Sequence, residues 1–296
     1  MKKISEAKKL AEARKILFLT LILISIQAII FFLPLEIKSK FALNTENPTI
    51  LSFYLNHFTH FSLNHFLQNI FSFLFIMFLF IILSIKVKDN TKISKILFSA
   101  TIILPILISA SILLISSITN SKSNFLGFSS LLASFYSIFL VLLFNSYLKV
   151  PTSISTNFIL SILSLYLAAY FFYFEKILTP TLKLLLLALI PLATFYFLLS
   201  VNQMLKLKIL VVKRKVQVLL ILSPFIILFF LFVPLFPMRI IQENSRVGIE
   251  AHYIGLIFGF FWVHVYNTLE KLKVKFTQYC KAGKHFRKQS QLENQV

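Results

Sequence analysis

Two polar residues far apart in the sequence, Ser129 and His252, have the side chains that nucleophilic catalysis requires. A serine hydroxyl is a weak nucleophile at its ordinary pKa and needs a general base within hydrogen-bond reach, and histidine is the base most often used. Each residue alone also has a structural explanation, because serines in membrane helices often bond to their own backbone and a lone histidine often makes a non-catalytic contact. Chemistry follows only where the fold brings the two side chains together.

A second polar cluster lies in residues 60–69, which read HFSLNHFLQN. His65 and Asn69 are four apart, so on a helix they share one face and can present two side-chain donors to one point. His60 lies about 140° away from His65 around such a helix. We therefore expect His60 to cap or pack where the loop joins the helix. The alternative, that His65 and Asn69 only satisfy polar backbone groups at a helix start, stays open.

The glycines are few and lie close to these polar residues. Only five occur in the chain, and Gly127, Gly255 and Gly259 accompany Ser129 and His252. His252, Gly255 and Gly259 recur at spacings of three and four, so they share one helical face that contains a GxxxG pair. The segment after Ser129 offers a matching stripe of small residues: Ser130, Ala133, Ser134 and Ser137. Two such faces allow close approach of helix axes, which would bring His252 to Ser129.

Metal chemistry is the rival interpretation, because His57, His60 and His65 are close in the sequence. Their spacings of three and five do not place all three on one helical face, and no HExxH motif occurs. Asp and Glu total ten, none of them in the centre of an apolar segment, and Cys280 is the single cysteine. We expect no metal, no other cofactor and no disulfide.

The composition predicts an all-α, polytopic membrane protein, because 58% of the 296 residues are hydrophobic and 35 are Phe. Eight segments are apolar enough to cross about 30 Å of hydrocarbon as helices. The predicted spans are 16–35, 61–85, 93–118, 126–148, 157–175, 181–201, 216–236 and 250–269. The first is about 20 residues long and lacks a small-x-small cleavage site, which argues against a signal peptide. The second, fourth and eighth helices would then all begin at one membrane face.

The positive charge is distributed unevenly along the chain, whose formal net charge is +20. Most of the 30 basic residues fall in segments that are cytoplasmic if the N-terminus is inside, as the positive-inside rule requires. We therefore predict a basic cytoplasmic tail at 1–15, one transmembrane domain at 16–269 and a second basic cytoplasmic tail at 270–296. A cell membrane is the expected location, with the polar clusters toward the outer face and no nucleic-acid partner.

Together these residues resemble the signature of the rhomboid family of intramembrane serine proteases. The matching positions on the second, fourth and last expected helices are His60, His65, Asn69, Gly127, Ser129, His252, Gly255 and Gly259. The resemblance implies a six-helix core with about two extra helices and a Ser129–His252 dyad that cleaves transmembrane segments of membrane proteins. It also implies an oxyanion hole formed by His65, Asn69 and Ser129. Transmembrane protein substrates and the lipid bilayer are the expected partners, without an obligate protein partner.

The sequence departs from the family pattern in three respects. Ser130 follows the nucleophile where the family usually has Gly or another very small residue. Ala133 stands where an aromatic residue often packs on the catalytic histidine, with Phe135 or Tyr136 as possible substitutes. Three predicted helices, instead of one, separate the serine helix from the last. The alternative function is a catalytically inactive rhomboid-like protein that binds transmembrane segments, and a transporter is a more distant alternative.

Overall fold

The computed structural model describes residues 2–87, 93–119, 124–147 and 249–293, two short strands at 241–242 and 245–246, and isolated positions between 157 and 202. This part of the chain is mostly helical, which confirms the predicted all-α class. Four of its helices are long and apolar enough to cross a membrane, and they match the first four predicted spans: Glu6–Phe31, Leu63–Lys86, Ile93–Ile118 and Ser129–Tyr147. The predicted spans at 157–175, 181–201 and 216–236 lie outside the described residues, apart from the isolated positions.

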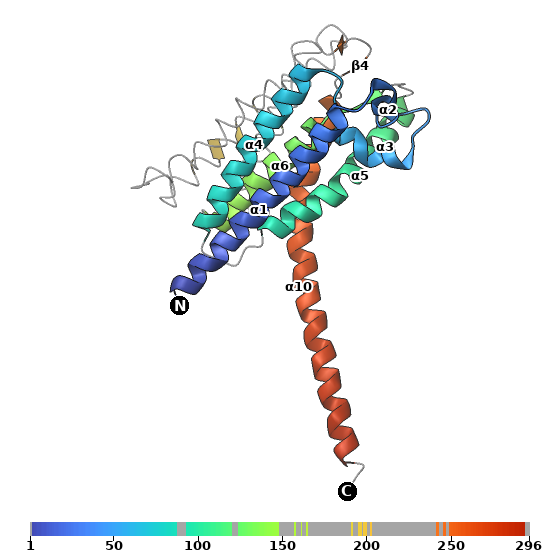
Figure 1. Ribbon diagram of the computed structural model, residues 1–296. Coiled ribbons are helices and arrows are strands. Elements are labelled where there is room, and N and C mark those ends of the chain that lie inside the picture. The colour runs from blue at the N-terminus through green and yellow to red at the C-terminus, as the bar shows by residue number, and fades with distance from the viewer. Residues whose placement is uncertain are drawn as a thin grey trace.

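The long helices form a bundle around α6, Ser129–Leu142, which a turn of π-helix extends over Leu143–Tyr147 (Figure 1). Helices α4 (Leu63–Lys86), α5 (Ile93–Thr119) and α10 (Ile249–Glu293) pack against it, and α1 (Lys2–Phe31) packs against α4 and α5. The apolar window of α6 is 89% buried inside the protein, against 33–50% for the other three candidate spans. Its circumference carries only apolar residues, small serines and Tyr136, which suits such an interior position.

A folded connection links α1 to α4 at the end of the bundle opposite the N-terminus. It contains α2 (Leu35–Ser39), strand β1 (Leu43–Asn44), α3 (Ile50–Leu55) and the 3-10 turn Asn56–Phe58. Strand β1 pairs antiparallel with β2 (Asn124–Phe125), with Leu43 opposite Phe125. This pairing fixes the chain just before α6 begins. A second pair, β3 (Ile241–Gln242) with β4 (Ser245–Arg246), precedes α10.

Aromatic rings join α4 to α6. Phe73 meets Phe128 edge to face with ring centroids 5.0 Å apart, and Phe80 meets Phe139 in the same way at 5.4 Å. Phe135 lies 5.9 Å from Phe73 on the same side. We call the residues that α6 and its N-cap contribute, Phe128, Phe135 and Phe139, the phenylalanine face. Edge-to-face pairs stabilise packing beyond the area they bury, and here they hold α4 against α6.

Small residues join α10 to α6. A Cβ added at Gly255 would collide with the backbone carbonyl oxygen of Ser130. A Cβ added at Gly259 would collide with the carbonyl oxygen of Ser134 and with the hydroxyl oxygen of Ser137. We call the surface formed by these five residues the small-residue face. The helix axes therefore approach as closely as a GxxxG pair allows.

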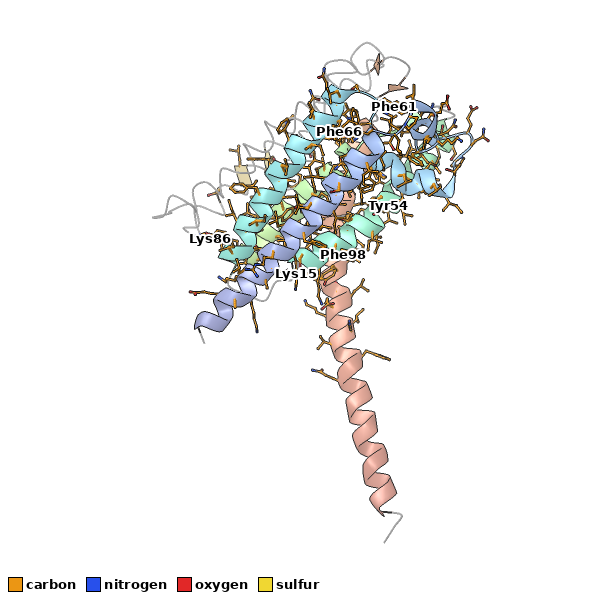
Figure 2. The ribbon with its side chains drawn as sticks, in the orientation of Figure 1. Lys15, Tyr54, Phe61, Phe66, Lys86 and Phe98 are labelled. Atoms are coloured by element: carbon orange, nitrogen blue, oxygen red, sulfur yellow. The ribbon has the colours of Figure 1, made fainter. Side chains whose placement is uncertain are left out.

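Helix α10 is longer than the last predicted span. Its first part corresponds to the predicted span at 250–269, yet α10 is not among the four helices that are apolar enough to cross a membrane. Residues 270–293, predicted as a basic tail, continue the same helix and extend beyond the bundle (Figure 1). Figure 2 shows the basic end of the bundle, with Lys15 and Lys86 far from Phe61 and Phe66.

Candidate active site

Ser129 and His252 meet at the end of the bundle where α6 and α10 both begin. The Ser129 hydroxyl donates to Nε2 of His252 across 2.6 Å, although the residues are 123 positions apart. Each of them is only 3% exposed. Acceptance at Nε2 requires the neutral imidazole that carries its proton on Nδ1. The arrangement is a hydroxyl hydrogen-bonded to a base, which is the geometry that an activated serine needs.

Gly127 holds the turn before α6 in a conformation that favours glycine, with φ at +115°. Its N–H donates to the carbonyl oxygen of Asn56 across 2.9 Å. A Cβ at Gly127 would lie 2.9 Å from Cε1 and 3.3 Å from Nε2 of His65, and 3.8 Å from the hydroxyl oxygen of Ser129. The absent side chain thus lets His65 lie against the turn that precedes Ser129.

The surroundings of Ser129 can stabilise negative charge. Ser129 is the first residue of α6, and the first N–H groups of a helix have no carbonyl partner within it. These N–H groups point out of the N-terminal end of the helix, which is also the positive end of the helix dipole. His65 stands beside this terminus on the first turn of α4, where Ser62 caps the helix by accepting from the His65 N–H at 3.3 Å. The site can therefore offer backbone N–H groups and an imidazole to an oxyanion.

Asn69 is placed differently from the expectation that it shares a target with His65. Its amide nitrogen donates to Nε2 of His60 at 3.1 Å and to the carbonyl oxygen of His65 at 3.0 Å. Nε2 of His60 also accepts from the N–H of Phe128 at 3.4 Å. Asn69 and His60 therefore connect α4 to the residue before the nucleophile. The oxyanion role of Asn69 stays a prediction that requires its amide to turn.

His60 is fully buried at this connection. Burial, followed by the nearby His65, lowers the pKa of His60 well below its ordinary value, so the ring is neutral near pH 7. A neutral ring with its proton on Nδ1 can accept both of these hydrogen bonds at Nε2. This matches the expectation that His60 packs where the loop joins the helix.

His57 is a polar residue of the site that sequence reasoning considered only as a metal ligand. Its Nε2 donates to the carbonyl oxygen of Pro105 at 2.9 Å, so its Nδ1 is the acceptor for the Ser130 hydroxyl, also at 2.9 Å. Burial lowers the pKa of His57 to about 4, so the imidazole ring is neutral at pH 7 and keeps its proton on Nε2. Ser130, the residue that departs from the family pattern, thus has a dedicated partner.

Pro105 leaves one backbone carbonyl of α5 without its helical hydrogen bond. A proline inside a helix has no N–H, so the carbonyl of Thr101 one turn earlier loses its helical partner. The hydroxyl of Tyr54 donates to that carbonyl at 3.2 Å. Helix α5 is thereby tied to α3, which directly precedes the 3-10 turn that carries His57. The signal in the sequence was a proline within an apolar segment, combined with polar residues in the preceding loop.

A small cavity adjoins the dyad. Its walls include both members of the dyad and their polar neighbours: Asn56, His57, Gly127, Ser129, Ser130 and His252. Its volume is about 10 Å³. That is close to the minimum for one water molecule and far below what a peptide segment needs. The cavity beside Ser129 is therefore too small for a peptide segment in this conformation.

Among the described residues, no three His, Cys, Asp or Glu side chains gather into a metal-binding group. Both ring nitrogens of His57 are engaged by Ser130 and Pro105, and Nε2 of His60 accepts from Asn69. Comparison of the chain with protein-family models, with curated proteins and with solved structures finds no match. The resemblance to rhomboid proteases consequently depends on the residues themselves.

Proposed function

We propose that this chain is an intramembrane serine endopeptidase of the rhomboid type, with Ser129 as nucleophile and His252 as general base. The observation that carries the proposal is the 2.6 Å hydrogen bond between the Ser129 hydroxyl and Nε2 of His252. The bond joins the start of α6 to the start of α10 in a buried position. Gly127, Gly255 and Gly259 support it, because each removes a side chain that would push the surrounding elements apart.

The reaction follows from these atoms. The Ser129 oxygen attacks the scissile carbonyl carbon while its proton passes to Nε2 of His252. His252 then gives that proton to the leaving amine, and an ester forms on Ser129. Water, deprotonated by His252, hydrolyses the ester and restores the serine. Backbone N–H groups at the start of α6, with His65, would stabilise the oxyanion formed in each half-reaction.

The proposed setting is a multi-pass protein of the cell membrane, with both termini cytoplasmic and the dyad toward the outer face. Ser129 follows Gly127, which lies against His65 in the first turn of α4, whereas Lys86 is the last residue of that helix. Such a position gives water a short path to the ester. Transmembrane segments of other membrane proteins are the proposed substrates.

Cleavage in reconstituted vesicles tests the proposal. Wild type is expected to cleave a panel of model transmembrane segments, whereas Ser129→Ala and His252→Ala are expected to lose turnover by at least about 10³-fold. Cys280→Ala is the matched control and keeps wild-type activity, since Cys280 has no role in this chemistry. A dead Cys280→Ala variant, or cleavage by Ser129→Ala, would exclude the proposed mechanism.

The alternative is a catalytically inactive rhomboid-like protein that binds transmembrane segments. The small cavity and the engagement of the Asn69 amide by His60 and His65 favour it, because the described site is closed and one expected donor points elsewhere. Crosslinking of model segments to wild type without any cleavage, in the same vesicles, would support the alternative over proteolysis.

A further inference from the structure

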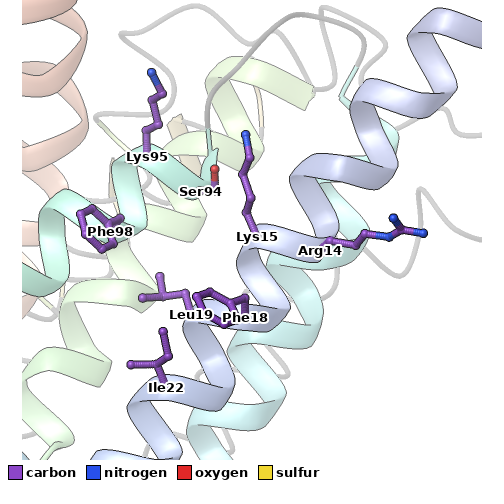
Figure 3. Close-up of a pocket in the computed structure, with 8 residues that line it drawn as sticks. All are labelled: Arg14, Lys15, Phe18, Leu19, Ile22, Ser94, Lys95 and Phe98. Carbon is purple, nitrogen blue, oxygen red and sulfur yellow. The ribbon is translucent and has the colours of Figure 1, made fainter.

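A groove of about 690 Å³ lies between α1 and α5 at the basic end of the bundle (Figure 3), and Ser129 is not among the residues that line it. Its walls are apolar and come from Phe18, Leu19 and Ile22 of α1 and Phe98 of α5. Leu19 is buried, whereas Phe18 is 67% and Phe98 58% exposed. The groove therefore presents aromatic surface outward from the bundle, where lipid would surround the helices.

Cationic side chains stand at one end of this groove. Lys15 of α1 and Lys95 of α5 extend in the same direction from its two walls, and Arg14 lies on the other side of α1 (Figure 3). All three are exposed. Lys9, one turn and a half earlier on α1, instead donates to the carbonyl oxygen of Ile85 at 2.9 Å. The positive charge available at the groove is thus that of Lys15 and Lys95, with Arg14 nearby.

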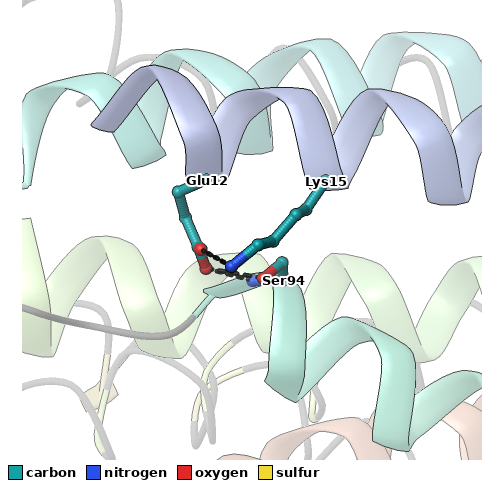
Figure 4. A network of polar contacts seen from close by, with 3 residues as sticks. All are labelled: Glu12, Lys15 and Ser94. Atoms are coloured by element: carbon teal, nitrogen blue, oxygen red, sulfur yellow. Dashed lines mark hydrogen bonds and ion pairs between the residues drawn. The ribbon is translucent and has the colours of Figure 1, made fainter. Parts of the chain in front are cut away.

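Glu12 is an acidic residue at this end of the bundle, and it contacts both Ser94 and Lys15 (Figure 4). One carboxylate oxygen accepts from the backbone N–H of Ser94 at 2.8 Å and from its hydroxyl at 2.7 Å. The other oxygen lies 3.7 Å from Nζ of Lys15, whose side chain stays 63% exposed. Glu12 therefore occupies the donors at the start of α5 while leaving most of the Lys15 ammonium accessible. Among the described residues, Lys95 has no ion-pair partner.

We propose that this groove binds an anionic phospholipid of the leaflet at the basic end. The phosphate lies between Lys15 and Lys95, and an acyl chain follows Phe18, Ile22 and Phe98. Charge complementarity selects this occupant, because a lone phosphate charge suits two ammonium groups, whereas a choline group would be repelled by them. A transmembrane helix would fill the apolar part but offers nothing specific to the lysines. The site needs only that these helices span a membrane and is independent of proteolysis.

Lipid binding to the purified full-length protein in detergent tests this site. Native mass spectrometry would compare phosphatidylglycerol with phosphatidylcholine of identical acyl chains. Wild type is expected to retain phosphatidylglycerol in preference to phosphatidylcholine. The double variant Lys15→Gln/Lys95→Gln is expected to bind phosphatidylglycerol with about tenfold lower affinity than wild type. The control Lys8→Gln/Lys86→Gln removes the same charge from exposed positions at the same end and is expected to change affinity less than twofold. All substituted lysines are exposed, so the variants should fold.

A second measurement distinguishes the lipid from a protein helix. Phe18→Cys in a Cys280→Ser background places one reactive thiol in the groove, and phosphatidylglycerol is expected to slow its alkylation by a maleimide. The proposal is overturned if both double variants lose affinity equally, if the two lipids bind wild type equally, or if a transmembrane peptide protects the thiol and phosphatidylglycerol does not.

Discussion

Helix α6 contacts its two main neighbours through opposite kinds of surface. Toward α10 it presents the small-residue face, where Gly255 and Gly259 touch the backbone of α6 at Ser130 and Ser134. Toward α4 it presents the phenylalanine face, where ring pairs stand 5.0–5.9 Å apart. The first surface has backbone on both sides and no room for an added carbon, whereas the second consists of contacts between aromatic side chains.

This difference corresponds to what each neighbour contributes to the site. Helix α10 carries His252, whose Nε2 must be within hydrogen-bond reach of Ser129, and α4 carries His65, which approaches through the space at Gly127. In a membrane, helices associate through close packing, since lipid is as apolar as the side chains. A rigid contact therefore positions the proposed base, and a softer one positions the proposed oxyanion donor.

The largest expected effect comes from adding one methyl group to the rigid surface. Gly255→Ala would place a carbon against the backbone carbonyl of Ser130, so α10 must move away from α6. Because overpacking typically costs about 1–3 kcal/mol, we expect a clear fall in thermal stability and loss of turnover by at least about 100-fold. Circular dichroism in detergent and the vesicle assay would measure both.

The matched control is Ile257→Phe, which enlarges a side chain that is 39% exposed on the same helix. It should leave turnover and stability close to wild type. If Gly255→Ala also behaves like wild type, the close contact does not position His252.

The next effect concerns the donor carried by α4. His65→Ala removes the imidazole beside Gly127 while leaving the dyad in place. We expect turnover to fall about 10²-fold with little change in substrate binding, as for loss of one oxyanion donor. Asn69→Ala provides the comparison, since its amide holds His60 and the His65 carbonyl. We expect the turnover of Asn69→Ala to fall about tenfold, because the variant only loosens the positions of His60 and His65. Equal kcat values for wild type and His65→Ala would exclude the oxyanion role.

Acid sensitivity tests the polar contact that supports Ser130. Burial holds the pKa of His57 at about 4 in the folded protein, below the ordinary 6.5. Between these values the unfolded chain binds a proton that the folded protein does not, so stability is complete above pH 6.5 and falls as pH drops toward 4. The slope is at most about 1.4 kcal/mol per pH unit for one group. Unfolding of wild type and His57→Gln across this window would measure it; parallel curves would contradict the account.

The smallest expected effect lies on the phenylalanine face. Phe139→Leu removes one edge-to-face pair with Phe80, at mid-helix and far from the dyad. Such a pair contributes about 0.5–1.5 kcal/mol beyond area burial, so the melting temperature should drop by a few degrees. Turnover should stay within about twofold of wild type. A loss as large as that of Gly255→Ala would remove the distinction between the two surfaces.

Much of this arrangement could be predicted from residue types and spacing. Apolar length gave four spans that the structure confirms by length and composition, and the spacing of His252, Gly255 and Gly259 placed them on the face that meets α6. Both predictions depend on the local geometry of one helix. The pattern of charges alone, in contrast, does not reveal that the tail after residue 269 continues as helix.

The contacts made by His57 and Asn69 could not be predicted in the same way. Each depends on where a loop meets a different helix: His57 reaches Pro105 and Ser130, and Asn69 reaches His60. Sequence spacing places His65 and Asn69 on one face, but a histidine from the preceding loop competes for the Asn69 amide. Such long-range competition for donors is decided by tertiary packing, which one sequence does not encode in any short pattern.

Labelling by a fluorophosphonate probe tests the central claim most directly, because the probe reacts with a serine only where a base activates it. The account predicts covalent labelling of wild type at Ser129, detected by intact mass and peptide mapping. It predicts no labelling of Ser129→Ala and strongly reduced labelling of His252→Ala. Folded wild-type protein that stays unlabelled, or a Ser129→Ala variant that labels as well as wild type, would contradict the assignment of Ser129 and His252 as a catalytic dyad.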